Sequence, residues 1–264
     1  MDIRFDMGKS EKTIESFKDI RNEYPDTKFI STGNAPIAAG KTLFAMNLAE
    51  ATNGFSLSLD RFLFAEFCKA EPEIVKKITG VDPKIYEGNI DKYIFDNVLL
   101  KKKFYENYLM VAEKFIEKNT CAKIQEVIKN PKKFTKTKGI NFTPAYKDTE
   151  IVFGTPLSKP DKIILDLSPM PESIQKSSTA LYDINVPQAA RVLAFIQREL
   201  ADYRGKITPK LIKALTHRVM NVTKVEEKIL DTRPKGDFEF NNSEHSLEKM
   251  KQKINEISEQ LREL

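Results

Sequence analysis

The feature that most constrains this chain is the octapeptide Ala35–Thr42, which reads Ala-Pro-Ile-Ala-Ala-Gly-Lys-Thr. It follows the phosphate-loop pattern G-x-x-x-x-G-K-[ST], with Ala35 in place of the first glycine. In this pattern, successive backbone N–H groups and the positive end of a helix dipole face the phosphates of a nucleotide. Lys41 reaches the terminal phosphates, and the Thr42 hydroxyl is a ligand for Mg²⁺. The motif therefore predicts a site for ATP or another nucleotide, with Mg²⁺.

The residues on either side of the motif support this interpretation. Lys28–Thr32 has the composition of a short strand, and Lys41–Ala51 has that of a helix, which Asn53-Gly54 ends. The competing interpretation is a chance Gly-Lys-Thr at a helix start, but strand, loop and helix in this order favour phosphate binding. The predicted nucleotide-binding residues are Ile37, Ala38, Ala39, Gly40, Lys41 and Thr42, with Thr42 also predicted to bind the metal.

Two features depart from the phosphate-loop pattern. Ala35 and Pro36 stiffen a turn that normally needs glycine, and Pro36 has no backbone N–H to donate. A second alignment starts the loop at Gly33-Asn34 and treats Ala35-Pro36 as an insertion. Both alignments depart from the pattern, so the motif predicts a nucleotide site without establishing turnover.

The remainder of the chain alternates between strand and helix patterns. This alternation predicts an α/β fold with a mainly parallel sheet and helices on both faces. Ligands of such sheets bind at the carboxyl ends of the strands, where the loop falls. Further strands are predicted at Phe55–Leu59, Glu150–Thr155, Lys162–Leu167 and Lys228–Thr232. Further helices are predicted at Ser10–Glu23, Asp91–Lys118, Pro187–Tyr203, Pro209–Val222 and Asn242–Leu264.

Length and composition suggest one domain of this class. A chain of 264 residues suits a single α/β domain. We expect residues 1–27 to form an N-terminal helical extension and residues 28–264 to form the phosphate-loop domain. A Lys- and Thr-rich stretch near residues 129–148 has the character of an insertion.

Charge, hydropathy and cysteine usage exclude several functions. The net charge of +5 comes from interspersed Lys and Glu, which is typical of solvated helix faces and not of a nucleic-acid track. The chain contains no run of about 18 apolar residues, which is the length that a membrane-spanning helix needs. Cys68, Cys121, His217 and His245 lack metal-ligand spacing. The first residues resemble neither a signal peptide nor a transit peptide, so either no import signal is needed or a presequence has been removed.

At the loop, Gly33-Asn34 followed by Ile37–Thr42 resembles the G-N-I-A-A-G-K-S segment of deoxynucleoside kinases. Other segments follow in the family's order: the second strand leading to Asp60, the pocket helix, the strand before the lid and the C-terminal ending. The last three correspond to Asp91–Lys118, Lys162–Gln175 and Asp237–Ile257. The resemblance implies a phosphate-loop NTPase-like, deoxynucleoside kinase-like fold. If the chain is active, Asp60 is the candidate general base, and otherwise it caps the segment that follows the strand.

The departures from that family concern its charged groups. Active members carry an Asp/Glu-Arg-Ser motif that Thr120–Pro160 lacks, and the lid position Gln175–Thr179 has one Lys and no Arg. In this respect, and in the stretch Gly205–Thr208, the chain is similar to the kinase-like accessory subunits of mitochondrial complex I. That resemblance implies a structural or assembly subunit of NADH:ubiquinone oxidoreductase on the matrix side of the inner membrane. Its partners would be other subunits, and its phosphate loop would bind nucleotide without turnover.

Two alternatives stay open: an active (deoxy)nucleoside or nucleotide kinase, and an unrelated phosphate-loop ATPase or toxin-type kinase. The first needs a positive clamp over the phosphates. Arg191, Arg198 and Arg204 could supply it, although a solvated helix face is the simpler interpretation.

Apolar side chains outside the loop are candidates for a protein interface. Phe17, Phe134, Val192 and Phe195 would anchor a partner if exposed, or would pack within their own domain.

Overall fold

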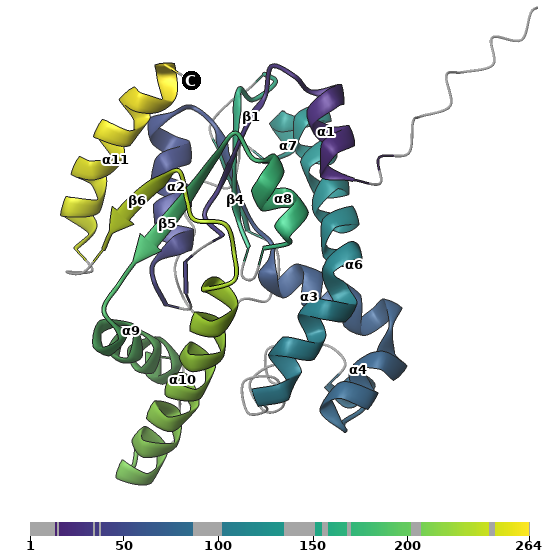
Figure 1. Cartoon of the computed structure of the whole chain (residues 1–264), viewed down its shortest axis with the longest axis vertical. Coiled ribbons are helices and arrows are strands. Elements are labelled where there is room, and N and C mark those ends of the chain that lie inside the picture. Colours follow the sequence, from purple (N-terminus) through teal and green to yellow (C-terminus); the bar gives the residue numbers. More distant parts are fainter. Residues whose placement is uncertain are drawn as a thin grey trace, which may run out of the picture.

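The protein folds around a six-stranded sheet with the order β3-β2-β4-β1-β5-β6 (Figure 1). The computed structural model describes residues 14, 16–33, 35–36, 38–86, 102–134, 151–154, 158–167, 170–201, 207–242 and 246–263. The strands are β1 (Lys28–Ser31), β2 (Phe55–Ser58), β3 (Ile151–Gly154), β4 (Lys162–Asp166), β5 (Ala180–Asn185) and β6 (Phe238–Asn241).

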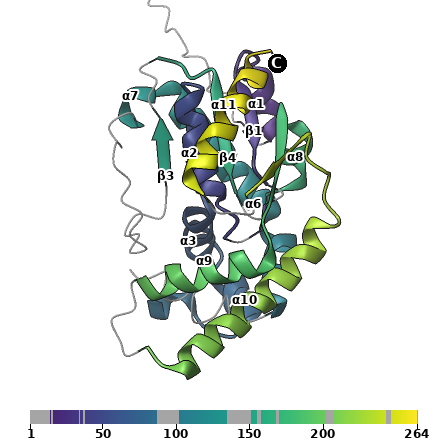
Figure 2. The ribbon, with the colours of Figure 1, turned by 90° about the vertical axis from the view of Figure 1, so that its left-hand side faces the viewer.

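Strand direction confirms the predicted parallel sheet, with one exception. Strands β2, β4, β1, β5 and β6 run parallel to their neighbours, whereas β3 pairs with β2 in the antiparallel sense. Figure 2 shows β3 at the outer edge of the sheet, beside α7 (Pro131–Phe134). The central strand β1 lies between β4 and β5, so the chain crosses to opposite sides of β1 in its two halves. The carboxyl end of β1 is therefore a topological switch point, where sheets of this kind bind ligands.

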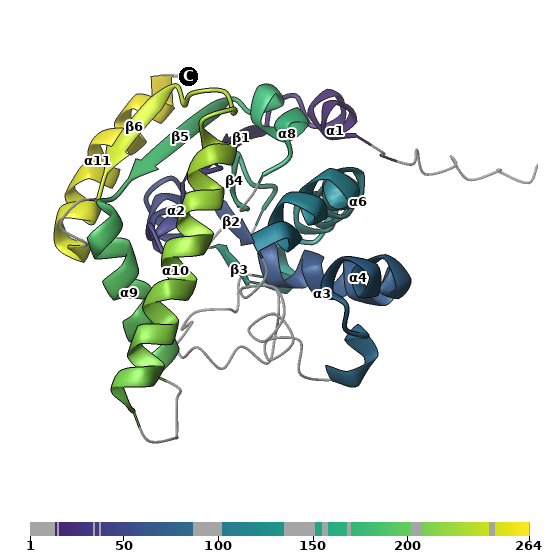
Figure 3. The same cartoon turned by 60° about the horizontal axis from the view of Figure 1, so that its bottom comes forward.

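Helices cover both faces of the sheet, as the sequence predicted. One face carries α2 (Lys41–Ala51) and α11 (Leu247–Glu263), which pack against each other. The other face carries α1 (Phe17–Glu23), α6 (Lys102–Lys129) and α8 (Glu172–Ser177) (Figure 3). The remaining helices are α3 (Asp60–Ala70), α4 (Pro72–Thr79), the 3₁₀ turn η1 (Pro83–Tyr86), α9 (Gln188–Ala201) and α10 (Pro209–Leu230).

Successive strand residues supply two separate cores because they point to opposite faces. In β4, Ile163 and Leu165 belong to the cluster under α1 and α6, and Ile164 belongs to the cluster under α2 and α11. In β1, Phe29 and Ile30 divide in the same way. This double burial explains why these strands read as continuous apolar runs in the sequence.

Helix α1 begins later than the sequence predicted. Ser16 is its N-cap: the Ser16 hydroxyl accepts from the Asp19 N–H, and Asp19 accepts from the Ser16 N–H, both at 3.2 Å. This reciprocal capping box starts the helix at Phe17, and residues 10–13 and 15 of the predicted helix lie outside the described residues. Phe17 packs edge-to-face on Phe29 at a centroid distance of 5.2 Å. The helix therefore packs on the sheet, and the division near residue 27 stays a prediction.

Two helices are longer than predicted. Helix α6 continues to Lys129, past the predicted end at Lys118, and α10 continues to Leu230. The prediction of a strand at Lys228–Thr232 is therefore wrong. Its Ile-Leu pair lies at the end of a helix whose preceding Lys and Glu residues favour helix. Residues 91–101 of the predicted pocket helix and residues 135–148 of the predicted insertion lie outside the described residues.

Strands β5 and β6 were not predicted from the sequence. The apolar pattern of these strands is interrupted by polar residues on one face: Asp183 and Asn185 in β5, and Glu239 and Asn241 in β6. Asp183 is half-buried and the other three are exposed, so this face is not covered as those of the inner strands are.

The aromatic side chains considered as partner anchors lie inside the protein. Phe17 has no exposed surface, Phe195 is 1% exposed and Phe134 is 7% exposed. They pack within their own domain, which corrects the suggestion that they anchor a partner. Val192 is half-buried on α9.

Candidate functional site

The segment Ala35–Thr42 joins the carboxyl end of β1 to the first turn of α2. Gly40 is the N-cap of α2 and offers no side chain to accept from the N–H groups of the first turn. Those groups are the ones that a helix leaves to an external acceptor, and the helix dipole favours an anion there. The loop therefore stands at the switch point of the sheet with a helix N-terminus behind it.

Two loop residues have left-handed backbone conformations. Gly40 has φ +85°, which glycine adopts freely, but Ala38 has φ +58°. A non-glycine residue in this region costs about 1–2 kcal/mol. Such strain is typical of ligand-binding loops, where the surrounding structure enforces the conformation. Left-handed residues at alternate positions also turn neighbouring N–H groups toward one concave side.

Lys41 is buried along the loop. It is 9% exposed, and its Nζ donates to the carbonyl oxygen of Pro36 at 3.3 Å. This contact spans the loop from its last residues to its beginning. A phosphate on the loop would offer Lys41 a charged acceptor in place of a neutral carbonyl, and charge-assisted hydrogen bonds are roughly twice as strong.

A residue that the sequence analysis missed, Asp166, completes this side of the site. It is the last residue of β4, the strand next to β1, and it is 1% exposed. The Thr42 hydroxyl donates to Asp166 Oδ2 at 2.5 Å, and Asp166 Oδ1 is buried without a hydrogen-bond partner. The available signal was an acid that directly follows the apolar run Lys162–Leu165, because an acid at the end of a buried strand lies at the ligand edge.

The Thr42–Asp166 pair fits Mg²⁺ that is also bound to phosphate. In phosphate-loop proteins a loop Ser or Thr and a strand-end Asp hold this ion, and Mg²⁺ keeps several waters and phosphate oxygens as its other ligands. The unpartnered Oδ1 of Asp166 could bond such a water. Within the described part of the chain, no group of three or more His, Cys, Asp or Glu side chains could bind a metal by itself. The pair therefore suits a metal that arrives with a nucleotide.

A second residue that the sequence did not reveal supports the loop from behind. Asn242 follows β6, is 5% exposed, and donates from Nδ2 to the Ala39 carbonyl at 3.0 Å. Its backbone N–H donates to the Asn185 carbonyl at 2.9 Å. A Cβ atom on Gly40 would lie 2.9 Å from Asn242 Nδ2. Glycine is therefore required at position 40 both for its backbone conformation and for this close contact.

The segment predicted to be a lid is packed beside β1. Gln175–Thr179 covers the end of α8 and the approach to β5, alongside β1. The Thr179 N–H donates to the Phe29 carbonyl at 2.7 Å, and Arg21 of α1 donates to the Ser177 carbonyl at 2.9 Å. A Cβ on Gly33 would lie 2.9 Å from Gln175 Nε2. These contacts attach the segment to β1, α1 and Gly33, and its role as a lid stays a prediction.

The structure places Asp60 at the same edge of the sheet as the loop. It follows the carboxyl end of β2, separated from β1 by β4, and is the first residue of α3. Its side chain is half-buried. The N-cap of α3 is Leu59, so Asp60 does not cap the helix in the predicted way. Its role as a general base stays a prediction.

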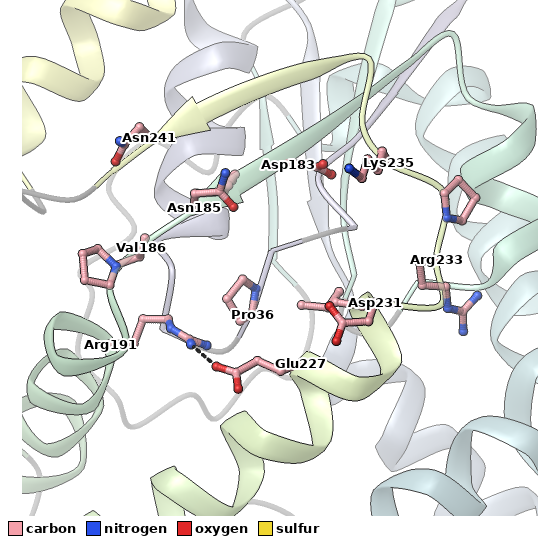
Figure 4. A pocket seen from close by; sticks show the side chains of 14 residues that line it. Pro36, Asp183, Asn185, Val186, Arg191, Glu227, Asp231, Arg233, Lys235 and Asn241 are labelled. Atoms are coloured by element: carbon pink, nitrogen blue, oxygen red, sulfur yellow. Dashed lines mark hydrogen bonds and ion pairs between the residues drawn. The ribbon is translucent and has the colours of Figure 1, made fainter.

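A pocket of about 580 Å³ adjoins the other side of the loop (Figure 4). Pro36 lines it, together with the end of β5, the start of α9, the end of α10 and the segment that leads into β6. Arg191 of α9 also lines it, is 4% exposed, and forms an ion pair with Glu227 of α10 at 2.8 Å. Arg191 is therefore not part of a solvated helix face. The Arg198 side chain and residue 204 lie outside the description, and His217 is exposed.

Comparisons with known proteins do not place the chain in a family. No family model matches it, and no curated protein is significantly similar to it in sequence. Among the described residues, no helix is long and apolar enough to cross a membrane.

Proposed function

We propose that the protein binds a nucleoside triphosphate with Mg²⁺ on the loop Ala35–Thr42. The observation that carries this proposal is the 2.5 Å hydrogen bond between Thr42 and Asp166, which places a buried carboxylate beside the loop hydroxyl. The pair lies at the carboxyl edge of the sheet, where β4 adjoins the central strand, and this is the position expected for a phosphate-bound metal.

The residues Ala38–Thr42 have defined parts in this proposal, and Ile37, also predicted to bind the nucleotide, lies outside the described residues. The N–H groups of Ala38–Thr42 bind phosphate oxygens, and Lys41 leaves the Pro36 carbonyl to neutralise the terminal phosphates. Mg²⁺ supplies further charge neutralisation when it is bound through Thr42 and Asp166. Asn242 keeps the Ala39 carbonyl turned away from the anion through their 3.0 Å hydrogen bond. The Ala39 N–H donates to the Pro36 carbonyl at 3.2 Å, so it exchanges this acceptor for a phosphate oxygen when the nucleotide binds.

Our proposal for the wider role is an accessory subunit of NADH:ubiquinone oxidoreductase, on the matrix side of the inner mitochondrial membrane. The resemblance of Gly33–Thr42 to deoxynucleoside kinases supports it, together with the lack of an Asp/Glu-Arg-Ser motif in Thr120–Pro160 and the similarity of Gly205–Thr208 to the kinase-like accessory subunits. A bound nucleotide would then stabilise the subunit without being consumed.

The second candidate is a (deoxy)nucleoside or nucleotide kinase. One structural observation favours it: the guanidinium of Arg191 lies in a pocket that the loop residue Pro36 also lines. An arginine near the phosphates can stabilise a transferring phosphoryl group and contribute about 10³-fold or more in rate. This candidate would need Arg191 to reach the nucleotide and a base such as Asp60 to face the acceptor.

Calorimetric titration with MgATP and MgGTP tests nucleotide binding. We expect saturable binding that Lys41→Met weakens at least tenfold, while Lys69→Met, which changes an exposed lysine paired with Glu66, leaves it unchanged. Equal binding by all three proteins would disprove the loop as the site.

Two further measurements separate the wider roles. Phosphoryl transfer to common nucleosides at about one turnover per second would favour the kinase. Gentle detergent extraction of mitochondrial membranes, followed by size separation, should show the protein migrating with NADH-dehydrogenase activity. Migration apart from that activity would reject the accessory-subunit role.

A further inference from the structure

The pocket beside Pro36 contains a charged group whose hydrogen bonding is incomplete. Arg191 is only 4% exposed, yet its Nε and Nη1 atoms have no hydrogen-bond partner among the described residues. Only Nη2 is engaged, with Glu227 at 2.8 Å. A buried guanidinium with two unpartnered nitrogen atoms is costly, because buried polar groups are almost always paired. The arrangement calls for an additional acceptor.

The partner that Arg191 does have is weakly held. The Glu227 side chain is 48% exposed, so water competes for it and the ion pair contributes little stability. A guanidinium has five N–H donors in a planar fork, so it can accept a second oxyanion while keeping or releasing Glu227. Figure 4 shows Arg191 and Glu227 meeting on the helical side of the pocket, near Pro36.

The opposite wall offers a buried acceptor. Asp183 of β5 accepts from the Gly236 N–H through Oδ2 at 2.9 Å, but its Oδ1 is buried without a partner. Figure 4 places Asp183 on the strand side of the pocket. A ligand with a hydroxyl or amino group beside its anionic group would satisfy Asp183 as well as Arg191. Arg233 and Lys235, which also line the pocket, offset the charges of Asp183 and Asp231.

We propose that this pocket is a second binding site, for a small organic oxyanion held by Arg191 and carrying a hydroxyl or amino donor for Asp183. Its volume of about 580 Å³ lies within the range of about 300–1,000 Å³ that is usual for small-molecule sites. The site uses Pro36 as a wall and none of the N–H groups of Ala38–Thr42. It therefore stands independently of nucleotide binding on the loop.

Two sources supply this chemistry: a free carboxylate or phosphate metabolite, and the sugar-phosphate part of a nucleotide. Inorganic phosphate and malate are the probes for the free anion, and MgATP is the probe for the nucleotide. Binding is measured by calorimetry and by the shift of the thermal unfolding midpoint. For a free anion we expect phosphate or malate to bind when the loop is saturated with MgATP. If the nucleotide is the source, we expect MgATP to abolish phosphate and malate binding, and we expect Arg191→Gln to weaken MgATP binding.

The variants separate this pocket from the loop. Lys41→Met should keep phosphate and malate binding, and Arg191→Gln should abolish it. Glu227→Gln frees the guanidinium from a competing carboxylate and should tighten binding about two- to fivefold, which matches the strength of a partly exposed ion pair. If Arg191→Gln does not fold, the test is whether Glu227→Gln binds phosphate and malate more tightly than the unaltered protein does.

Two results would overturn the proposal. One is loss of anion binding in Lys41→Met with retention in Arg191→Gln, since that locates the anion on the loop. The other is the absence of phosphate and malate binding in both the unaltered protein and Glu227→Gln, with MgATP affinity unaffected by either pocket substitution. If the loop does not bind nucleotide, malate should still bind in the pocket and Arg191→Gln should still abolish that binding.

Discussion

The two sides of the loop Ala35–Thr42 differ in the space beside their unpartnered polar atoms. On the β4 side, the Thr42 hydroxyl donates to Asp166 Oδ2 at 2.5 Å, and Asp166 Oδ1 is buried without a partner among the described residues. On the β5–β6 side, Arg191 and Asp183 retain unpartnered atoms around a pocket of about 580 Å³. Both sides lie at the carboxyl edge of one parallel sheet. The difference indicates that the β4 side offers one carboxylate oxygen close to the loop hydroxyl, whereas the β5–β6 side has room for a small molecule.

The largest expected effect tests how closed the β4 side is. Burial raises the pKa of the Cys68 thiol from 9.0 to about 12, and burial raises that of Cys121 to about 12, with a smaller contribution from Glu117 and Asp19. At pH 8 these shifts lower the thiolate fraction about 10³-fold, so thiol reagents should label native protein at least that much more slowly than unfolded protein. Rapid thiol labelling of a protein whose circular dichroism spectrum is that of the native state would show that this side opens.

The same thiols predict a direction for stability against pH. Their folded-state pKa values lie above the unfolded value, so from about pH 9 towards pH 12 the unfolded chain loses protons that the folded chain keeps. Their contribution to the free energy of unfolding is therefore constant below pH 9 and decreases above it. A Cys68→Ala, Cys121→Ala double variant should show a smaller decrease in urea unfolding between pH 8 and pH 10.

The next effect concerns the metal. Asp166→Asn should reduce the Mg²⁺-dependent part of ATP affinity about 10- to 100-fold, because it removes the charge beside Thr42 while preserving shape. Asp237→Asn is the matched control: Asp237 accepts from the Leu181 N–H of β5 at 2.9 Å and lies outside the site. Equal losses in both variants, or no dependence on Mg²⁺ in the unaltered protein, would contradict a metal on the β4 side.

A smaller effect is expected from the support behind the loop. Asn242→Ala removes the hydrogen bond to the Ala39 carbonyl, which is worth about 0.5–1.5 kcal/mol, and should weaken MgATP about two- to tenfold. Asn119→Ala removes a comparable bond to the Phe115 carbonyl within α6, at 2.8 Å, and should leave MgATP affinity unchanged. An affinity change in Asn119→Ala as large as in Asn242→Ala would reduce Asn242 to a general stabilising residue.

The smallest effect tests the strain in the loop. Ala38→Gly removes the side chain that opposes φ +58° and should raise the free energy of unfolding by about 0.5–1 kcal/mol. Ala39→Gly is the control, since Ala39 is not in the left-handed region and glycine there should lower stability by a similar amount. Urea unfolding of the two variants measures the direction of each change in the free energy of unfolding. A lower free energy of unfolding for Ala38→Gly would contradict strain at this position.

Prediction from sequence succeeded for elements whose bounds are set by nearby residues. The strand at Lys28, the helix Lys41–Ala51 and the buried strand beginning at Lys162 were placed within one residue of their observed ends. Each combines a strong local propensity with a clear stop, such as Gly54 or Asp166. In the predicted C-terminal helix, the apolar residues at three- and four-residue spacing include Met250, Ile254, Ile257 and Leu261, which are buried. Leu247 belongs to the same stripe but is 46% exposed, and Leu264 lies outside the described residues.

Prediction failed where a residue's role depends on a distant partner. Arg191 resembles any exposed helix arginine in the sequence, and its burial follows from Glu227, 36 positions later. Asn242 lies 203 positions from the Ala39 carbonyl that it binds, and Asp166 lies 124 positions from Thr42. A pattern with a short period contains no information about such pairs.

The sequence alone determined that Ala35–Thr42 is a loop ahead of a helix N-terminus, because Pro36 and Gly40 limit the backbone and Lys41–Ala51 favours helix. It also determined the parallel α/β architecture, because buried strands and covering helices have different apolar periods. Only the tertiary structure decided what surrounds the loop. Strand order brings Asp166 to one side and the end of β5 with Arg191 to the other, and strand order depends on long-range packing that local propensity does not encode.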